Sequence, residues 1–146
     1  MYSLVYRSVA EPFVDTRIIR EILETARNFN KKNDITGCLL FYHGEFIQYL
    51  EGRQTTVLKL FDSIKADKRH RNVQLLSYAT IKEREFADWS MAYEDFLGDN
   101  DQLQFIKLLL SSYVENPKNA MDPNPSSVFF WRAARRLLKS KSSREY

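Results

Sequence analysis

Residues 35–52 read ITGCLLFYHGEFIQYLEG, and this stretch decides the fold. Its two apolar runs, residues 35–42 and 45–50, each predict a strand because they are rich in aromatic and aliphatic side chains. The pair His43-Gly44 lies between them and supplies the positive φ that a tight hairpin turn needs. We expect Glu51-Gly52 to end the second strand. The stretch therefore predicts a β-hairpin.

The first strand of this hairpin also predicts layers on both faces of the sheet. Residues 37–42 (GCLLFY) are apolar at consecutive positions instead of alternating ones. Strands show this pattern when both faces of their sheet are covered. We therefore expect helices on both sides.

A strand and two helices flank the hairpin. Residues 2–9 predict a first strand, and Asp15 is a candidate N-cap for the helix that follows. The apolar positions of this helix recur at helical spacing, and asparagines mark its frayed end. The apolar positions are Ile18, Ile19, Ile22, Leu23, Ala26 and Phe29. The asparagines are Asn28, Asn30 and Asn33. A second amphipathic helix is expected to begin at Thr55 or Thr56 and to end near Lys65.

The remaining chain completes an α+β fold. Residues 72–81 predict a fourth strand, and the second half of residues 86–93 predicts a fifth. The order βαββαββ, with right-handed crossovers, gives a ferredoxin-like mixed sheet with two helices on one face. Apolar helical runs at 103–110 and 128–138, joined by a proline-rich linker, are expected to cover the other face.

We expect three regions in the chain: a sheet domain over 1–98, a helical cap over 99–140 and a flexible basic tail over 141–146. The length of 146 residues suffices for one packed core. The composition, 44% hydrophobic and 28% charged, excludes a disordered chain. The net charge of +3, from 22 cations and 19 anions, is too small to indicate a surface that coats nucleic acid.

Cysteine and hydropathy patterns bound the environment. Cys38 is the only cysteine, which excludes an intrachain disulfide and predicts a reducing cytoplasm. We expect no membrane segment, because no window approaches about 18 apolar residues. The sequence holds no glycine-rich phosphate loop, no metal-ligand spacing and no nucleophile elbow, so we expect neither a metal nor an enzyme.

Two polar side chains stand inside apolar strands. Tyr6 lies in the first strand and Gln48 in the third, and a buried amide costs free energy unless it is hydrogen-bonded. The predicted topology allows these strands to be neighbours, so the Tyr6 hydroxyl could reach Gln48. The pair is either structural or functional. Cations at the helix exits, near Lys31 and over residues 67–71, are either solvated caps or a phosphate site.

Five segments occur in a characteristic order along residues 2–96, about two thirds of the chain. They are Val5-Tyr6-Arg7-Ser8, Asn30 with Asp34-Ile35-Thr36-Gly37, Phe46-Ile47-Gln48-Tyr49-Leu50-Glu51-Gly52, Asp67-Lys68-Arg69-His70 and Phe86-Ala87-Asp88-Trp89-Ser90-Met91. Together they resemble the BLUF family, blue-light sensors that use a flavin. The resemblance implies a BLUF domain over residues 1–98, in a short single-domain member.

The resemblance also implies roles for individual residues. Tyr6 would be the light-driven electron and proton donor, and Gln48 the amide that switches hydrogen-bond partners. Asn30 would fix the edge of the flavin ring. The other implied cofactor-binding residues are Arg69, His70, Asp67, Phe46 and Ile64, of which the first two meet the ribityl and phosphate end with support from Asp67. Trp89 and Met91, on the last strand, would relay the signal.

The implied cofactor is FAD, with FMN as the second choice. About 50 residues follow the sensor segment, fewer than the ~100–150 of a typical output domain, so we expect signalling through a protein partner or a homo-oligomer. One alternative is a nucleic-acid-binding module without chromophore, in which sheet aromatics and the basic tail beside Trp131 and Arg132 contact nucleic acid. Another is a small flavin enzyme or acyl-phosphate hydrolase, for which the sequence offers no substrate acid or base.

Overall fold

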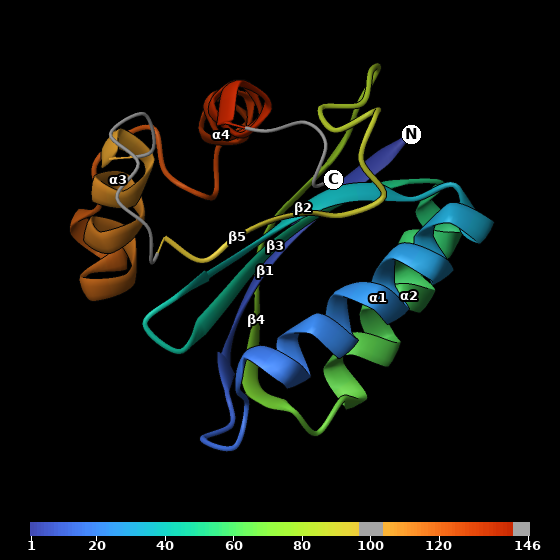
Figure 1. The fold of residues 1–146 in the computed structure, drawn as a ribbon. Coiled ribbons are helices and arrows are strands. Elements are labelled where there is room, and N and C mark those ends of the chain that lie inside the picture. Colours follow the sequence, from blue (N-terminus) through green and yellow to red (C-terminus); the bar gives the residue numbers. More distant parts are fainter. Residues whose placement is uncertain (97–103, 142–146) are drawn as a thin grey trace.

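The computed structural model describes residues 1–96 and 104–141 (Figure 1). Its strands are β1 (Tyr2–Ala10), β2 (Thr36–Tyr42), β3 (Glu45–Gly52), β4 (His70–Thr80) and β5 (Ala92–Glu94). Its α-helices are α1 (Thr16–Asn33), α2 (Gln54–Ala66), α3 (Gln104–Glu115) and α4 (Val128–Lys141), with a 3₁₀ turn at Pro117–Asn119. The predicted element order is confirmed.

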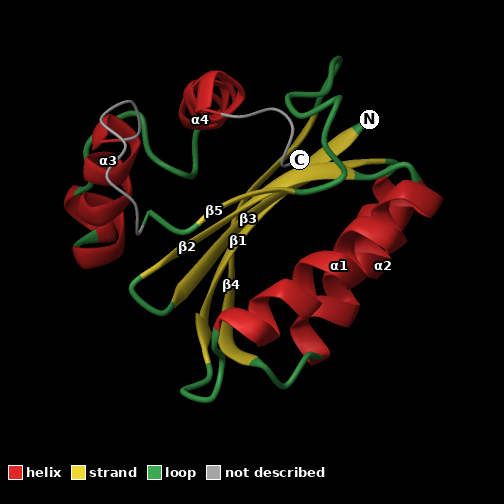
Figure 2. Cartoon of the chain, in the orientation of Figure 1, coloured by secondary structure: helices red, strands yellow, loops and turns green. Residues whose placement is uncertain are grey.

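The five strands form one mixed sheet in the order β4-β1-β3-β2-β5. β1 pairs antiparallel with both β3 and β4, β2 pairs antiparallel with β3, and β5 pairs parallel with β2. α1 and α2 lie on one face of the sheet, and α3 and α4 lie on the other (Figure 2). The ferredoxin-like α+β prediction is confirmed.

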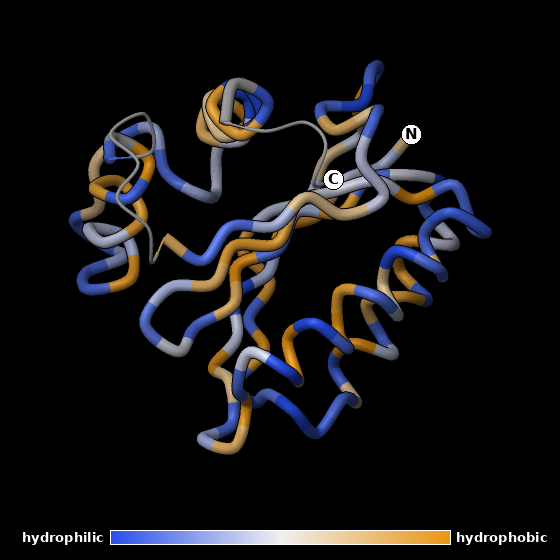
Figure 3. Tube along the Cα trace, viewed as in Figure 1, coloured by the Kyte–Doolittle hydropathy of each residue, from blue (hydrophilic) through white to orange (hydrophobic). Residues whose placement is uncertain are grey.

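Each face of the sheet has its own hydrophobic core, because side chains alternate along the strands. On the side of α1 and α2, Leu4, Leu39 and Leu50 pack with the two helices. On the side of α3 and α4, Tyr49 packs with Trp131 and other cap residues. Both helical layers alternate between hydrophobic and hydrophilic segments along their turns (Figure 3). The expected double covering of the sheet is confirmed.

The first helix and the hairpin form as their residues dictate. The Asp15 side chain accepts a hydrogen bond from the Ile18 backbone N–H at 2.9 Å, so Asp15 is the N-cap. His43 and Gly44 both have positive φ, 48° and 76°, as a type I′ hairpin requires. These two predictions are confirmed.

Four local predictions are wrong. Asn30 does not mark a frayed end, because α1 continues to Asn33 and Asn30 is 1% exposed. β3 includes Glu51-Gly52, since strand pairing with β1 and β2 continues there. α2 begins at Gln54 and has no side-chain cap, so Thr55 and Thr56 lie within its first turn.

The fourth error concerns the last strand. β5 spans only Ala92–Glu94, because just three of its residues pair with β2. Trp89 and Met91 therefore precede the strand. None of the helices within 1–96 and 104–141 has both the length and the hydropathy needed to cross a bilayer. The expected domain boundary at 98/99 lies outside the described residues, and so does the expected tail over 141–146 except for Lys141, which is the last residue of α4 and not part of a tail.

The cap of α1 gives a test of the fold, because this helix positions Asn30. Asp15→Ala should lower the free energy of unfolding by about 1 kcal/mol, since it leaves a helix N–H group without its acceptor. Urea unfolding measures this change. Asp62→Ala is the control, because within 1–96 and 104–141 the Asp62 side chain makes one exposed ion pair, with Lys65, and its loss should shift stability by less than ~0.5 kcal/mol. Equal effects of the two substitutions would contradict the role of Asp15 as N-cap of α1.

Candidate functional site

The centre of the site is a buried pair on neighbouring strands. β1 and β3 place Tyr6 directly opposite Gln48, and the Tyr6 hydroxyl donates to Gln48 Oε1 at 2.5 Å. Tyr6 is 4% exposed and Gln48 5%. Burial raises the pKa of Tyr6 above its usual value, and the negative charge of Asp67 raises it further. Tyr6 is therefore a neutral phenol, and its hydroxyl group donates a hydrogen bond to the amide oxygen of Gln48.

The other end of the Gln48 amide meets a sulfur. Gln48 Nε2 donates to Met91 Sδ at 3.4 Å, so the amide lies between a phenol and a thioether. A thioether sulfur accepts hydrogen bonds only weakly. The orientation of the amide follows from these two partners, because the phenol needs an acceptor and the thioether has no proton to give. The hydrogen bond from Gln48 Nε2 to Met91 is therefore weak, and a stronger acceptor could replace it.

A cavity of about 270 Å³ borders this pair, between α1, α2 and the sheet. Its lining includes every residue that the sequence assigned to the photochemical pair or to cofactor binding. These are Tyr6, Asn30, Phe46, Gln48, Ile64, Asp67, Arg69 and His70. The surface of the cavity wall is mostly apolar, and its polar groups include the Tyr6–Gln48 pair, Asn30 and the cluster at residues 67–70, a combination typical of sites for small-molecule cofactors.

Asn30 has one end of its amide free to bind a ligand. Its Nδ2 donates to the backbone oxygen of Ser90 at 2.7 Å. Its Oδ1 is buried and has no hydrogen-bond partner among the described residues. An unsatisfied buried oxygen costs free energy, so its presence beside a cavity calls for an N–H donor from a bound molecule. An imide N–H at a ring edge would meet this need.

The end of the cavity near the exit of α2 is polar. Arg69 Nη2 pairs with Asp67 Oδ2 at 2.5 Å, and the hydrogen bonds from Arg69 lower the pKa of Asp67. His70 bridges two elements, with Nδ1 at 2.7 Å from Ser8 Oγ and Nε2 at 2.5 Å from the Ile64 carbonyl oxygen. Because a carbonyl only accepts, Nε2 carries a proton, which it donates to Ile64. This end of the cavity therefore carries charged and hydrogen-bonding side chains.

The two expected relay residues lie on opposite faces of the sheet. Met91 is buried in the same core as Tyr6, where it contacts Gln48. Trp89 is buried in the core of the other face and packs against Phe86, with ring centroids 5.8 Å apart. Neither residue lines the cavity.

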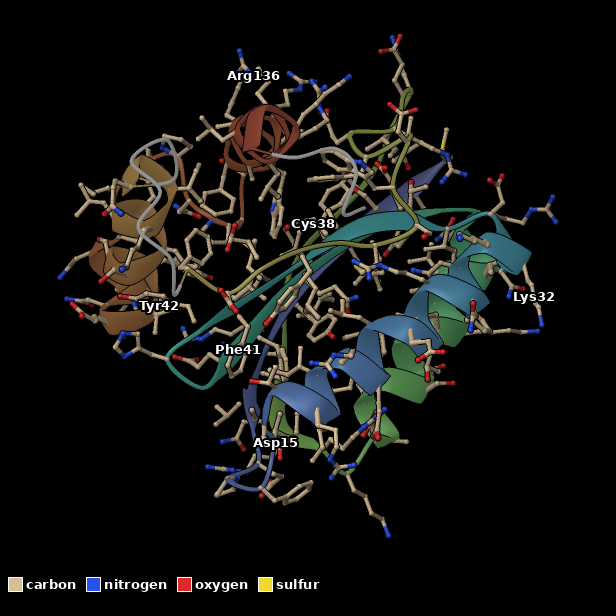
Figure 4. All side chains as sticks on the ribbon, viewed as in Figure 1. Asp15, Lys32, Cys38, Phe41, Tyr42 and Arg136 are labelled. Atoms are coloured by element: carbon tan, nitrogen blue, oxygen red, sulfur yellow. The ribbon has the colours of Figure 1, made fainter. Side chains whose placement is uncertain are left out.

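Cations at the exit of α1 do not join the cavity lining. Lys31 and Lys32 are exposed, and the side chain of Lys32 points away from the sheet (Figure 4). Cys38 lies within the sheet on the side of α4 and is fully buried (Figure 4). Neither group belongs to the site.

Seven residues of the cavity wall were not assigned to the site from sequence. They are Ile22, Thr25, Ala26, Phe29, Leu39, Leu60 and Ser63. The apolar stripe of α1 contains three of them, but periodicity cannot tell a face that packs on a sheet from one that borders a cavity. Thr25 and Ser63 belong to no sequence pattern that would have assigned them to a cavity wall.

The sheet surface does not suit a nucleic-acid-binding module. Such modules stack bases on exposed aromatic side chains of the sheet. Here Phe46 and Tyr49 of the central strand β3 are 4% and 3% exposed, because helices cover both faces there, whereas Tyr78 on the edge strand β4 is 66% exposed. This alternative is not favoured.

The sequence is similar to those of known proteins. The family model described as "BLUF: Sensors of blue-light using FAD" matches residues 1–92. A photoactivated adenylate cyclase subunit beta from Euglena longa is 34% identical over 105 residues, which are 70% of this chain and 12% of that protein. The blue light- and temperature-regulated antirepressor BluF from Escherichia coli is 32% identical over 64% of this chain and 23% of its own length. The chain thus spans about an eighth of the cyclase.

Solved structures of similar length agree over nearly the whole chain. BlsA in its photo-activated state aligns with a TM-score of 0.75 and 32% identity, covering 94% of both chains. The dark-state BLUF protein BlrB aligns with a TM-score of 0.72 and 25% identity, covering 96% of both chains. The unpartnered Asn30 oxygen beside the cavity suits the imide edge of an isoalloxazine, the ring system of the FAD that the family description names. This chain belongs to the BLUF family of flavin-binding blue-light sensors.

Proposed function

We propose that the blue-light response of this sensor arises at Tyr6 and Gln48. The observation that carries the proposal is their 2.5 Å hydrogen bond in the wall of the cavity. A bound flavin supplies light absorption and an electron acceptor. Tyr6 is then the donor of an electron and of the proton on its hydroxyl oxygen. Gln48 is the adjacent group that can accept that proton or exchange its bonds.

The amide of Gln48 has two unlike ends, and this makes it a switch. In the structure Oε1 faces the Tyr6 hydroxyl and Nε2 faces Met91 Sδ. If the amide rotates, Oε1 faces Met91, and the contact is lost because both atoms are acceptors. Met91 therefore distinguishes the two orientations of the amide, which supports its role as the first relay residue.

A single hydrogen bond cannot drive the response alone. It contributes about 0.5–1.5 kcal/mol, whereas moving an equilibrium from 1:99 to 99:1 takes about 5.5 kcal/mol. The switch must therefore change packing. We propose that the change runs through Met91 and Trp89 to α3 and α4, because these two residues lie on opposite faces of the sheet.

We propose FAD as the cofactor, since the matched family is described by it. Asn30 would bind the ring edge through Oδ1, with Phe46 and Ile64 as apolar wall. Arg69 and His70, supported by Asp67, would bind the ribityl and phosphate end. FMN is the alternative that a binding titration distinguishes.

The output is proposed from the relatives. In the Euglena proteins a segment like this one is part of an adenylate cyclase, and in Escherichia coli it is part of an antirepressor. We propose that residues 1–98 sense light and that the cap over 99–141, with the tail over 142–146, signals to a protein partner or changes a homo-oligomer. The chain itself would have no enzymatic activity and would act in the cytoplasm, where Cys38 stays reduced.

The switch gives the first test. The purified protein should be yellow, and blue light should shift its flavin absorption to the red, with reversal in darkness. Tyr6→Phe and Gln48→Leu should keep the colour and abolish the reversible shift, because each removes one half of the buried pair. Tyr78→Phe, at a position 66% exposed, should keep the full shift. A folded protein that takes up no flavin would refute the proposal.

The cofactor contact at Asn30 is tested by affinity. Asn30→Ala removes the unpartnered Oδ1 and should weaken flavin binding about tenfold, as expected for one lost hydrogen bond in a buried site. Asn33→Ala, in the exposed last turn of the same helix, should leave affinity unchanged. Titration of apoprotein with FAD and with FMN, followed by flavin fluorescence, measures both effects and ranks the two cofactors. Equal affinities of the two variants would exclude the contact.

The neutral phenol of Tyr6 predicts a dependence of stability on pH. The folded pKa is raised above the unfolded value of about 10, so this stabilisation is complete below about pH 10 and is lost as pH rises further. Each such group lowers the free energy of unfolding by about 1.4 kcal/mol per pH unit there. Urea unfolding of Tyr6→Phe should show a slope shallower by about this amount. Identical slopes for the variant and the natural chain would contradict a raised pKa.

A further inference from the structure

Glu51 is a buried carboxylate that the proposed photochemistry does not use. It lies on β3 and is 0% exposed. Oε1 accepts from the Glu85 backbone N–H at 2.7 Å and from the Tyr49 hydroxyl at 3.0 Å. Oε2 accepts from the Phe86 backbone N–H and from the Thr36 hydroxyl, both at 2.7 Å. Four donors thus converge on one charge.

These bonds fix one end of the β4–β5 connection, residues 81–91, to the sheet. The Glu51 bonds hold its residues 85 and 86 to β3. Arg84 strengthens the attachment, because it donates to Thr36 Oγ1 at 2.9 Å and pairs with Asp34 at 3.1 Å. The first half of the connection is therefore tied to β2 and β3 by charged groups.

The other end of the same connection is held beside the flavin cavity. Asn30 Nδ2 donates to the Ser90 carbonyl, and Arg27 Nε donates to the Met91 carbonyl at 3.0 Å. The Gly37 N–H donates to the Trp89 carbonyl at 3.2 Å. Asn30 and Met91 thus join this end to the cavity wall and to Gln48.

From Glu51 the connection reaches the helical cap. The Glu85 carboxylate pairs with Arg132 of α4 at 2.8 Å. The Phe86 ring contacts Trp131 of α4 edge to face, with centroids 6.3 Å apart, and Trp131 is completely buried. β3 itself presents Gln48 to the cavity and, three residues later, Glu51 to the side of α4. One strand therefore carries the switch on one face and this attachment on the other.

We propose that Glu51 is a positioning residue of the photoresponse: it holds residues 85 and 86 against β3 so that a change at Gln48 and Met91 moves α4. The inference rests on the proposed switch and adds the group that couples it to the cap. Without this attachment, the connection would absorb the change at Met91 by moving alone. With it, the displacement passes to Arg132 and Trp131.

The test is the light-minus-dark difference in deuterium uptake of α4, measured by mass spectrometry on the flavin-loaded full chain. Glu51→Gln keeps the shape but turns an N–H₂ group toward backbone donors, so the attachment at residues 85 and 86 weakens. It should keep the reversible red shift and reduce the α4 difference at least threefold. Residues 85 and 86 should exchange faster in darkness.

The control is Tyr49→Phe, which removes one neutral donor and leaves both backbone N–H bonds to Glu51. It should keep the α4 difference. A second variant, Arg132→Gln, changes a side chain that is 48% exposed, so it leaves the core intact. It should reduce the α4 difference at least twofold, because the Glu85–Arg132 ion pair between the connection and α4 is lost.

The outcomes separate this inference from the proposed switch. A natural chain without a reversible red shift refutes the switch. A normal shift together with an undiminished α4 difference in Glu51→Gln overturns the role of Glu51 and leaves the switch standing. If Glu51→Gln takes up no flavin, Arg132→Gln decides: a reduced difference supports the inference, and an unchanged one overturns it.

Discussion

The antiparallel pairing of β1 with β3 is the constraint on which the rest of the structure depends. It sets Tyr6 directly opposite Gln48, so the phenol and the amide are close enough to form a hydrogen bond although they are 42 residues apart in the sequence. Both strands lie inside the sheet, where water cannot compete for these groups. A neutral, desolvated phenol bonded to an amide follows directly, and so does the short reach from both groups to the cavity.

The treatment of buried polar groups differs between the two faces of the sheet. On the face of α4, Glu51 has four donors, as a buried charge requires. On the cavity face, Asn30 Oδ1 has no partner among the described residues, and Gln48 Nε2 has only a sulfur. A protein whose buried polar groups were all hydrogen-bonded without a ligand would not leave these two atoms without a good partner. We propose that a cofactor completes the hydrogen bonding on this face.

The β4–β5 connection makes these two faces one system. Its residues 85 and 86 bond to Glu51 on the cap side, and its residues 90 and 91 bond to α1 on the cavity side. Because β5 is only three residues long, few ladder bonds hold this region, and side chains do most of the holding. A region held by a few strong polar contacts can exist in two arrangements, as a switch requires.

The sequence by itself determined the element order, the covering of both sheet faces, the Asp15 cap and the His43-Gly44 turn, because periodicity and turn chemistry act over a few residues. Its motifs also indicated the family and the eight cavity residues that the family assigns. Only the tertiary structure decided that Asn30 is buried with a free oxygen, that Trp89 and Met91 lie on opposite faces, and that Glu51 continues β3. Those features depend on partners that are distant in the sequence, such as Ser3, which pairs with Glu51 across the β1–β3 ladder, and Ser90, which bonds to Asn30, and local patterns carry no information about such contacts.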